Sequence, residues 1–158
     1  MKVSKIIASG LGTGFAPIAP GTVGSILGIF LWWILNYLLT GFNIDFRNIL
    51  LLNLLAIIVI LIVGVFSIKN VHKQWEHDAP EIVIDEIVGV WIAALALPFD
   101  RLYYLYALIL FRFFDIAKPL FIRKFDNMKN NWSVMLDDVL AGIYSFVLIQ
   151  ILLYFKII

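Results

Sequence analysis

The feature that most limits how this chain can fold is a run of 20 residues without a charge, Ile49 to Ile68. An apolar run of about 20 residues is long enough to cross the hydrocarbon core of a bilayer as a helix. A second charge-free run, Val23 to Leu39, has 17 residues and lies near the lower limit of that length. Because 63% of the whole chain is apolar, against about 45–50% in soluble domains, the sequence cannot supply a water-facing surface. We therefore expect an integral membrane protein.

Three further helices are predicted toward the C-terminus, the first two ending beside prolines that cannot continue a helix. These helices are Ile82 to Leu97, Leu102 to Ala117 and Asp137 to Phe155. The fold class is therefore all-α, a polytopic membrane bundle of four to five spans, in which Ile82 to Leu97 is either a short span or re-entrant. Residues 118–136 form a basic amphipathic connection. Since no polar linker divides the chain, we expect one domain over residues 1–158.

The positive charges predict an orientation for this bundle. With five spans, nine of the 12 Lys and Arg residues lie on the side of the N-terminus and three on the other. The side of a membrane protein that is richer in Lys and Arg usually faces the cytoplasm. We therefore place the N-terminus and the long loops at the cytoplasmic face. The net charge of +1 gives no indication of a nucleic-acid partner, and nothing in the sequence indicates an oligomer.

The acidic residues gather on that same side, which the rule for Lys and Arg does not predict. Nine of the 11 lie at or near it. An ionised carboxylate within a membrane helix costs at least about 2.5 kcal/mol, so it is expected to face a cation, a metal ion or water. Oxygen-only ligands suit Mg²⁺ or Mn²⁺ better than Zn²⁺. A metal site is favoured over helix capping and salt bridging for five acids on three helices: Asp85, Glu86, Asp115, Asp137 and Asp138.

Positive side chains surround the acid at Asp115 and favour phosphoryl chemistry. The candidates for binding phosphate oxygens are Arg112, Lys118 and Arg123. Cations of this kind hold and neutralise the non-bridging oxygens of a phosphoryl group. The alternative is ordinary attraction to anionic lipid headgroups. For Arg112, which lies inside an apolar helix, the functional interpretation is the better one.

Two other segments supply candidate site residues. Gly21 to Ser25 opens a helix whose backbone N–H groups could bind a phosphate, which makes Thr22 and Ser25 candidate contacts. A plain helix start is equally consistent with this segment. His77 is a candidate acid or base, although a solvated loop histidine is the commoner outcome, and Asp78 beside it is a further candidate metal ligand.

The motifs, taken in order, resemble the phosphatidylglycerophosphatase A family of bacterial membrane phosphatases. The blocks that carry the resemblance span residues 10–142 and are Gly10–Gly14, Ala19–Ser25, His77-Asp78, Ile82–Gly89 with Trp91, Phe111–Pro119 with Ile122-Arg123, and Met135–Gly142. Each block alone is modest evidence, but the ordered set is specific. Family members often carry a His-Gly-Gly-type segment before the Asp-Asp pair. Here Asn127 to Ser133 lacks it, so no role is transferred to that segment.

The resemblance implies Mg²⁺-dependent removal of the terminal phosphate of phosphatidylglycerophosphate, at the cytoplasmic face of the bacterial cytoplasmic membrane. It implies that Asp85, Glu86, Asp115, Asp137 and Asp138 are the metal and catalytic set. It also implies that Arg112, Lys118 and Arg123 bind the phosphate. Which acids bind metal and which one transfers a proton stays open. The attacking group, water or a carboxylate, stays open as well.

Two other functions were weighed against this one. An ion- or proton-coupled transporter would use the carboxylates as a relay, but it predicts acids through the depth of the bilayer and an internal repeat. A CDP-alcohol phosphotransferase would need a longer Asp-Gly to Ala-Arg to Asp pattern on one helix. The sequence lacks the repeat and that pattern.

Overall fold

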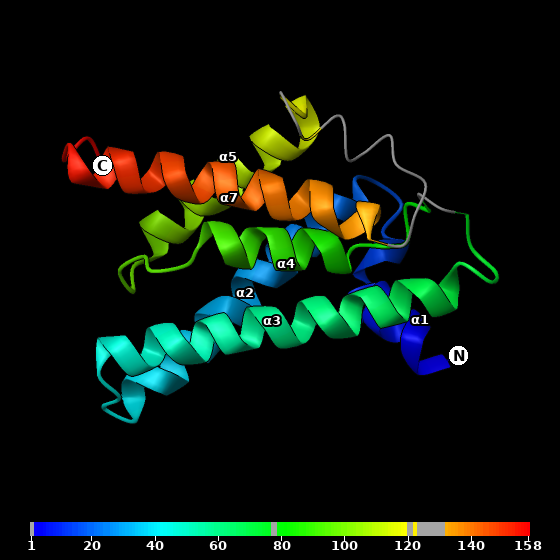
Figure 1. Ribbon diagram of the computed structural model, residues 1–158, viewed down its shortest axis with the longest axis horizontal. Helices are drawn as coiled ribbons and strands as arrows, with labels where there is room; N and C mark the ends of the chain where they lie inside the picture. Colours follow the sequence, from blue (N-terminus) through cyan, green and yellow to red (C-terminus); the bar gives the residue numbers. More distant parts are fainter. Residues whose placement is uncertain (1, 77–78, 120–121, 123–131) are drawn as a thin grey trace.

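The computed structural model describes residues 2–76, 79–119, 122 and 132–158 (Figure 1). Within these ranges the chain is helical and has no strand, which confirms the all-α prediction. The elements are α1 (Lys2–Ala8), the 3-10 helix η1 (Thr13–Phe15), α2 (Pro20–Gly41), α3 (Phe46–Val71), α4 (Ile84–Ala93), α5 (Arg101–Ala117) and α7 (Ser133–Tyr154).

Three of the described helices, α2, α3 and α7, are long and apolar enough to cross a membrane. Large apolar side chains stay exposed along them, as on α3, where Leu55, Ile58 and Phe66 are each more than half exposed. Such a surface is stable against lipid rather than water. The chain is therefore a membrane protein. Because α4 has 10 residues and α5 has 17, the structure does not extend this count to the predicted four or five spans.

α3, α4 and α7 run roughly along the long axis of the molecule, α2 and α5 cross it obliquely, and α4 lies between α3 and α7 in this view (Figure 1). α4 packs against both α2 and α7, and α5 packs mainly on α7. The chain enters α2, α4 and α7 at the same end of the bundle, and it leaves α5 there. This end therefore collects one terminus from each of four helices, and the polar site is built there.

Glycines allow α4 to approach its neighbours closely. On α2, a β-carbon at Gly24 would lie 2.7 Å from Cβ of Val83, and one at Gly28 would lie 3.2 Å from Cα of Ile87. Small residues four apart let membrane helices come into backbone contact. The indole Nε1 of Trp91 donates to the carbonyl oxygen of Gly28 at 2.8 Å, which fixes the two helices in this register.

The glycine-rich segment between α1 and α2 has a packing role. The N–H of Val83, just before α4, donates to the carbonyl oxygen of Ala8 at 2.9 Å. The carbonyl oxygen of Glu81 occupies the place that a β-carbon on Gly14 would need. Gly10 and Gly12 adopt positive φ angles of 51° and 98°, which glycine tolerates best. The segment therefore wraps the entry to α4 and holds it in position.

Two helix boundaries differ from the predicted ones by four residues, more than any of the others. α7 begins at Ser133 instead of Asp137, so Asp137 and Asp138 lie beyond the first turn, and no acid lies in that turn. Capping by the helix dipole therefore does not account for this pair. α4 ends at Ala93, four residues before the predicted end at Leu97, because the chain already turns there and Ala96 has a positive φ of 58°.

Candidate metal and phosphate site

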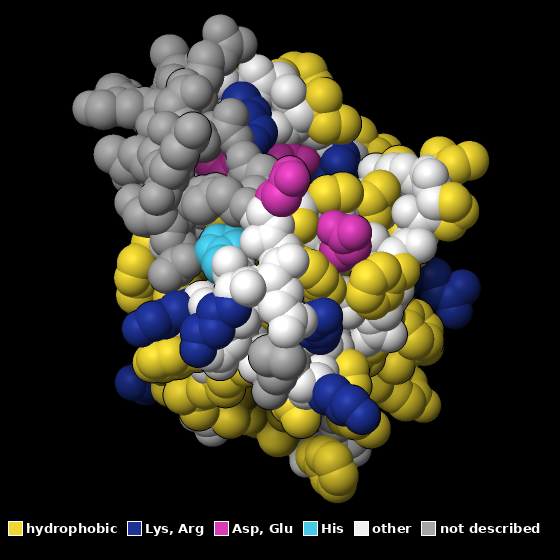
Figure 2. Space-filling model, turned by 90° about the vertical axis from the view of Figure 1, so that its right-hand side faces the viewer, with side chains coloured by type: hydrophobic (Ala, Val, Ile, Leu, Met, Phe, Trp, Pro, Cys, Tyr) yellow, Lys and Arg dark blue, Asp and Glu magenta, His cyan; other side chains and the backbone are white. Residues whose placement is uncertain are grey.

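A polar cavity of about 450 Å³ opens at the end of the bundle where α2, α4 and α7 begin. Figure 2 looks onto this end, where Asp and Glu side chains gather and Lys and Arg side chains stand on either side. The charged residues described in its lining are Asp85, Glu86, Arg112, Asp115, Lys118, Asp137 and Asp138. The structure thus brings together all five acids that the sequence assigned to one cluster, with two of the three predicted cations.

Three of the acids converge more closely than the others. Asp85, Glu86 and Asp138 each place a carboxylate oxygen within 4.8 Å of the others. They come from the first turn of α4 and from the second turn of α7. The contact of Gly89 with Gly142, where the backbones of α4 and α7 meet, lies four residues after Asp85 and Asp138 respectively. This crossing sets the two carboxylates opposite each other one helical turn away.

These carboxylates are held in an environment that disfavours their charge. Asp85 is buried, and this burial raises the pKa of its carboxyl well above the usual value, with the adjacent charge of Glu86 adding to the rise. Burial is also the main cause of the raised pKa of Glu86. The Oε2 atom of Glu86 is buried without a hydrogen-bond partner among the described residues. An oxygen in that position, close to two more carboxylates, fits a ligand to a hard divalent cation.

The other two acids are paired with the two cations. Nη1 of Arg112 lies 2.6 Å from Oδ2 of Asp115, one turn away on α5, and 3.9 Å from Oε1 of Glu86. Nζ of Lys118 lies 2.9 Å from Oδ2 of Asp137. Arg112 and Asp115 are three residues apart on α5, whereas Lys118 reaches across to α7. The five acids therefore divide into a convergent group of three and two that position cations.

Backbone geometry explains how Lys118 reaches α7. It is the C-cap of α5, with a left-handed conformation at φ 42° and ψ 55°. Left-handed residues commonly end helices, and Pro119 follows directly. The turn carries the side chain away from the axis of α5 and toward the cavity that Asp137 lines.

Gly21 contributes to the site in a different way from those that the sequence suggested. The sequence left two roles open for the segment that begins at Gly21, phosphate binding by backbone N–H groups or a plain helix start. In the structure a β-carbon at Gly21 would collide with Oε1 of Glu86 and lie 3.3 Å from Nη1 of Arg112. The absence of a side chain at this position therefore leaves room for the Glu86 and Arg112 side chains to meet beneath the start of α2.

The remaining predicted site residues lie elsewhere. Thr22 is half-buried and Ser25 is buried, and neither lines the cavity. The hydroxyl of Ser25 donates to the carbonyl oxygen of Gly21 at 2.8 Å. Their assignment as phosphate contacts stays a prediction. The predicted residues His77, Asp78 and Arg123 lie outside the described residues.

Sequence reasoning missed the glycines at the α4–α7 crossing and the apolar wall of the cavity. Ala79, Pro80, Ile82 and Val134 line it beside the charged residues. One signal was available for the glycines. Asp85 and Gly89 are four residues apart, and so are Asp138 and Gly142, which places each pair on one helical face.

The charges of the lining define what the cavity can bind. The described lining has five carboxylates and two cations, a formal charge of −3 when all seven are ionised. A phosphate dianion would be repelled by such a cavity. One divalent cation bound by the convergent acids would reduce this negative charge to −1, and two would reverse it to +1. The two paired cations would then face the anion.

Comparison with known proteins decides the family. The family model described as Phosphatidylglycerophosphatase A matches residues 6–153. The chain belongs to the phosphatidylglycerophosphatase A family. It is therefore an enzyme, a hydrolase of phosphomonoesters, and the resemblance drawn from the motif blocks is confirmed.

Three curated relatives of this phosphatidylglycerophosphatase A family member cover most of its length. Proteins named phosphatidylglycerophosphatase A from Escherichia coli K12 and Haemophilus influenzae are 34% and 36% identical, over 89% and 96% of this chain and 77% and 90% of the relatives. A Bacteroides thetaiotaomicron protein, provisionally named phosphatidylinositol-3-phosphatase, is 41% identical over 92% of this chain and 91% of its own. No solved structure is significantly similar to the chain.

Proposed function

We propose that this protein is a Mg²⁺-dependent phosphatidylglycerophosphate phosphatase, which releases the terminal phosphate to leave phosphatidylglycerol. One observation carries the proposal. In a member of this family, three carboxylate side chains converge within 4.8 Å, beside two cations held by the two remaining acids. A transporter relay has no comparable support, since the five acids gather at one end of the bundle.

Asp85, Glu86 and Asp138 are the residues that would hold the metal, because their oxygens converge and one of them is buried without a hydrogen-bond partner in the described structure. An ion bound there would polarise the phosphoryl oxygens and neutralise the charge that develops on them. Mg²⁺ is the favoured ion because the donor set consists of carboxylate oxygens alone.

Arg112 and Lys118 bind the phosphate oxygens in this proposal. Asp115 and Asp137 act as positioning residues, since each holds one of these cations at the cavity. In the reaction the bond between phosphorus and the ester oxygen breaks and water supplies the new oxygen. The protons of that water go to the departing alcohol and to the phosphate. A cavity carboxylate takes the first proton, either directly or after a carboxylate has itself formed a transient acyl phosphate.

The position of the site at one end of a membrane bundle suits a lipid substrate. We propose a multi-pass protein with its N-terminus and this cavity at the cytoplasmic face, as the excess of Lys and Arg on that side favours. The phosphorylated headgroup then enters the cavity from the membrane surface. The diacyl part of the lipid stays among the apolar helices.

The test is phosphate release by the purified protein from a panel of lipid phosphates, with Mg²⁺ and with a chelator. We expect hydrolysis of phosphatidylglycerophosphate that requires Mg²⁺ and is restored when the ion is added back. Release that is equally fast in the chelator would overturn the metal dependence. Absence of release from every lipid phosphate would overturn the function itself.

Phosphatidylinositol 3-phosphate is a second candidate substrate, favoured by the 41% identity to the Bacteroides thetaiotaomicron relative. Both lipids present a phosphomonoester on a headgroup derived from a polyol, so the same metal and cations would serve either. The ratio of kcat/KM for the two lipids decides between them, and we expect the ratio to favour phosphatidylglycerophosphate.

A further inference from the structure

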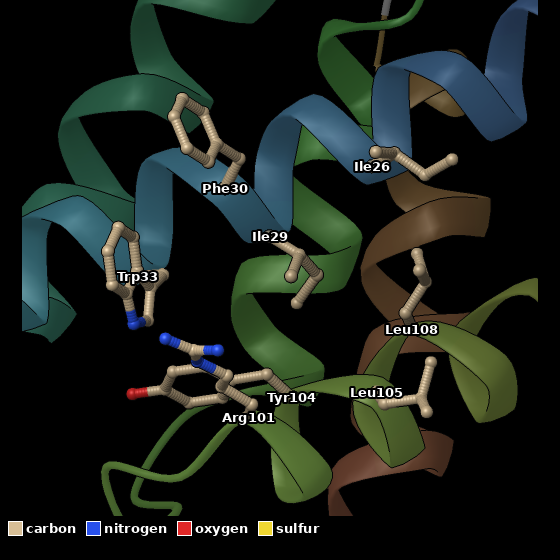
Figure 3. Close-up of a pocket in the computed structure, with 8 residues that line it drawn as sticks. All are labelled: Ile26, Ile29, Phe30, Trp33, Arg101, Tyr104, Leu105 and Leu108. Atoms are coloured by element: carbon tan, nitrogen blue, oxygen red, sulfur yellow. The ribbon is translucent and has the colours of Figure 1, made fainter.

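An apolar groove lies on the surface of the bundle between α2 and α5. Its volume is about 410 Å³. In Figure 3, Ile26 and Ile29 of α2 and Leu105 and Leu108 of α5 line it, with Trp33, Tyr104 and Arg101 at one end. Ile26 and Leu105 are about half exposed and Tyr104 is buried, so the groove has open walls and a closed floor. Its size falls in the range of ligand-binding pockets, roughly 300–1,000 Å³.

The groove continues the candidate site along the same two helices. On α2, Gly21 lines the polar cavity and Ile26 lines the groove; on α5, Arg112 lines the cavity and Leu108 the groove. These separations correspond to about 7.5 Å and 6 Å along a helix. The groove then extends to Trp33, about 18 Å from Gly21 by the same rise per residue. A molecule held by its phosphate in the cavity is therefore adjacent to the near end of the groove.

The polarity of the lining changes once on passing from the cavity to the groove. The cavity is lined by carboxylates and cations, whereas the groove is lined by aliphatic and aromatic side chains until Arg101 ends it. A glycerophospholipid has the same sequence of polarity from headgroup to acyl chain. We propose that this groove binds an acyl chain of the lipid whose phosphate occupies the site. The inference rests on the proposed function and adds where the substrate's hydrocarbon lies.

The expected benefit is orientation of the substrate. A lipid that is free to rotate in the bilayer presents its phosphate to the cavity in many directions. A chain seated between α2 and α5 would restrict the glycerol backbone to the cavity mouth, which lowers the entropy lost on reaching the reactive geometry. The protein should therefore prefer long-chain substrates over short-chain analogues with the same headgroup, even when both are fully dispersed in detergent.

The test blocks the groove with larger side chains and compares a long-chain substrate with a short-chain one. Ile26→Trp and Leu105→Trp place bulk in it from α2 and from α5. Ile58→Trp on α3 is the matched control, since Ile26 and Ile58 are 52% and 53% exposed and Ile58 lines no described cavity.

The readout is kcat/KM for a long-chain phosphatidylglycerophosphate divided by kcat/KM for its dihexanoyl analogue. We expect both groove variants to lower this ratio about tenfold, which corresponds to displacing between one and two methylene groups at roughly fourfold each. Ile58→Trp should keep the wild-type ratio.

An equal loss on both substrates in Ile26→Trp and Leu105→Trp would mean general damage to the fold, and it would overturn the inference. An unchanged ratio would overturn it as well. Neither result touches the proposed function, which fails only if the wild-type protein hydrolyses no lipid phosphate. The two failures are therefore distinguishable in one set of assays.

Photocrosslinking gives an independent readout of what occupies the groove. The probe is a non-hydrolysable phosphonate analogue of the lipid with a diazirine in its acyl chain. We expect labelling of residues 26–33 and 105–108 that excess unlabelled phosphonate suppresses. Equal labelling of α3, without competition, would identify the occupant as bulk lipid. No labelling of residues 26–33 and 105–108 would mean that no acyl chain enters the groove, and either result would overturn the proposal.

Discussion

The backbone carbonyl oxygen of Gly89 lies where a β-carbon on Gly142 would have to be. A β-carbon on Gly89 would in turn lie 2.8 Å from the carbonyl oxygen of Asp138. The two helices that carry the convergent carboxylates are therefore in backbone contact one turn from those carboxylates. The separation of Asp85 from Asp138 depends on this contact, which no other residue type at these positions allows without moving a helix.

The first prediction concerns this contact. Gly142→Ala should lower stability by about 1–3 kcal/mol, the usual cost of overpacking, and should abolish most of the activity by parting the carboxylates. Thermal unfolding in detergent and phosphate release measure the two effects. Gly41→Ala is the control, because Gly41 has no atom near its missing β-carbon. A fully active, equally stable Gly142→Ala protein would contradict the crossing.

The second prediction separates stability from activity at Asp85. Its pKa is raised in the folded state, chiefly by burial. The folded protein without metal therefore loses stability as pH rises above the ordinary carboxyl pKa of about 3.9. Asp85→Asn has no such loss, so in chelator its melting temperature should exceed that of the wild type at pH 7. The two should converge near pH 4.

The same Asp85→Asn protein should lose activity by about a hundredfold or more, since a charged ligand of the proposed metal ion is gone. Addition of Mg²⁺ should raise the melting temperature of the wild type and not that of the variant. A variant that is less stable than the wild type in chelator at pH 7, or one that keeps full activity, would contradict the assignment.

The third prediction tests Arg112 as a phosphate ligand. Arg112→Ala should lower kcat/KM by roughly 10²–10³-fold, as for other preorganised groups that stabilise a developing charge. Arg112→Lys should recover only part of this loss, because lysine cannot offer the paired donors of a guanidinium group. Inhibition by inorganic phosphate should weaken in parallel. Arg47→Ala, at the exposed start of α3, should leave both quantities at the wild-type values.

The fourth prediction concerns a polar contact far from the site. The amide Nδ2 of Asn53 on α3 donates to Oδ1 of Asn36 on α2 at 2.8 Å, and both side chains are buried. Hydrogen bonds between membrane helices contribute about 0.6 kcal/mol on average, and up to about 1.7. Asn53→Ala should therefore cost on the order of 1 kcal/mol of stability without lowering the activity of the folded protein. A double-mutant cycle with Asn36→Ala measures the coupling, which would be zero if the contact were absent.

The sequence predicted the part of the site that charge alone determines. Carboxylates are too costly in apolar helices to be there without a partner, so the sequence alone groups Asp85, Asp115 and Asp138. The long apolar helices could be predicted in the same way, from the length of the charge-free runs. Both arguments depend on the properties of single residues or of short segments.

What the sequence did not predict depends on contacts between segments. The division of the acids into a group of three and two ion-paired residues is set by how α4, α5 and α7 cross, as is the pairing of Lys118 with Asp137. Helix boundaries shifted for a related reason. The start of α7 at Ser133 brings Asp137 and Asp138 onto an established helix, whereas the hydrophobic run alone suggested that they begin one.

The placement of the convergent acids on α4 and α7 also bears on how the protein is made. About fifty residues separate Asp85 from Asp138 in the sequence, so the ribosome completes α4 well before α7. Until α7 docks, the two acids of α4 lack the third carboxylate of the convergent group, which α7 supplies. They also lie in a helix of only 10 residues. A nascent chain of this protein is therefore expected to depend on the translocation machinery or on a membrane chaperone to shelter α4. A metal ion bound as we propose needs acids from both helices, so its binding would report that synthesis and insertion are complete.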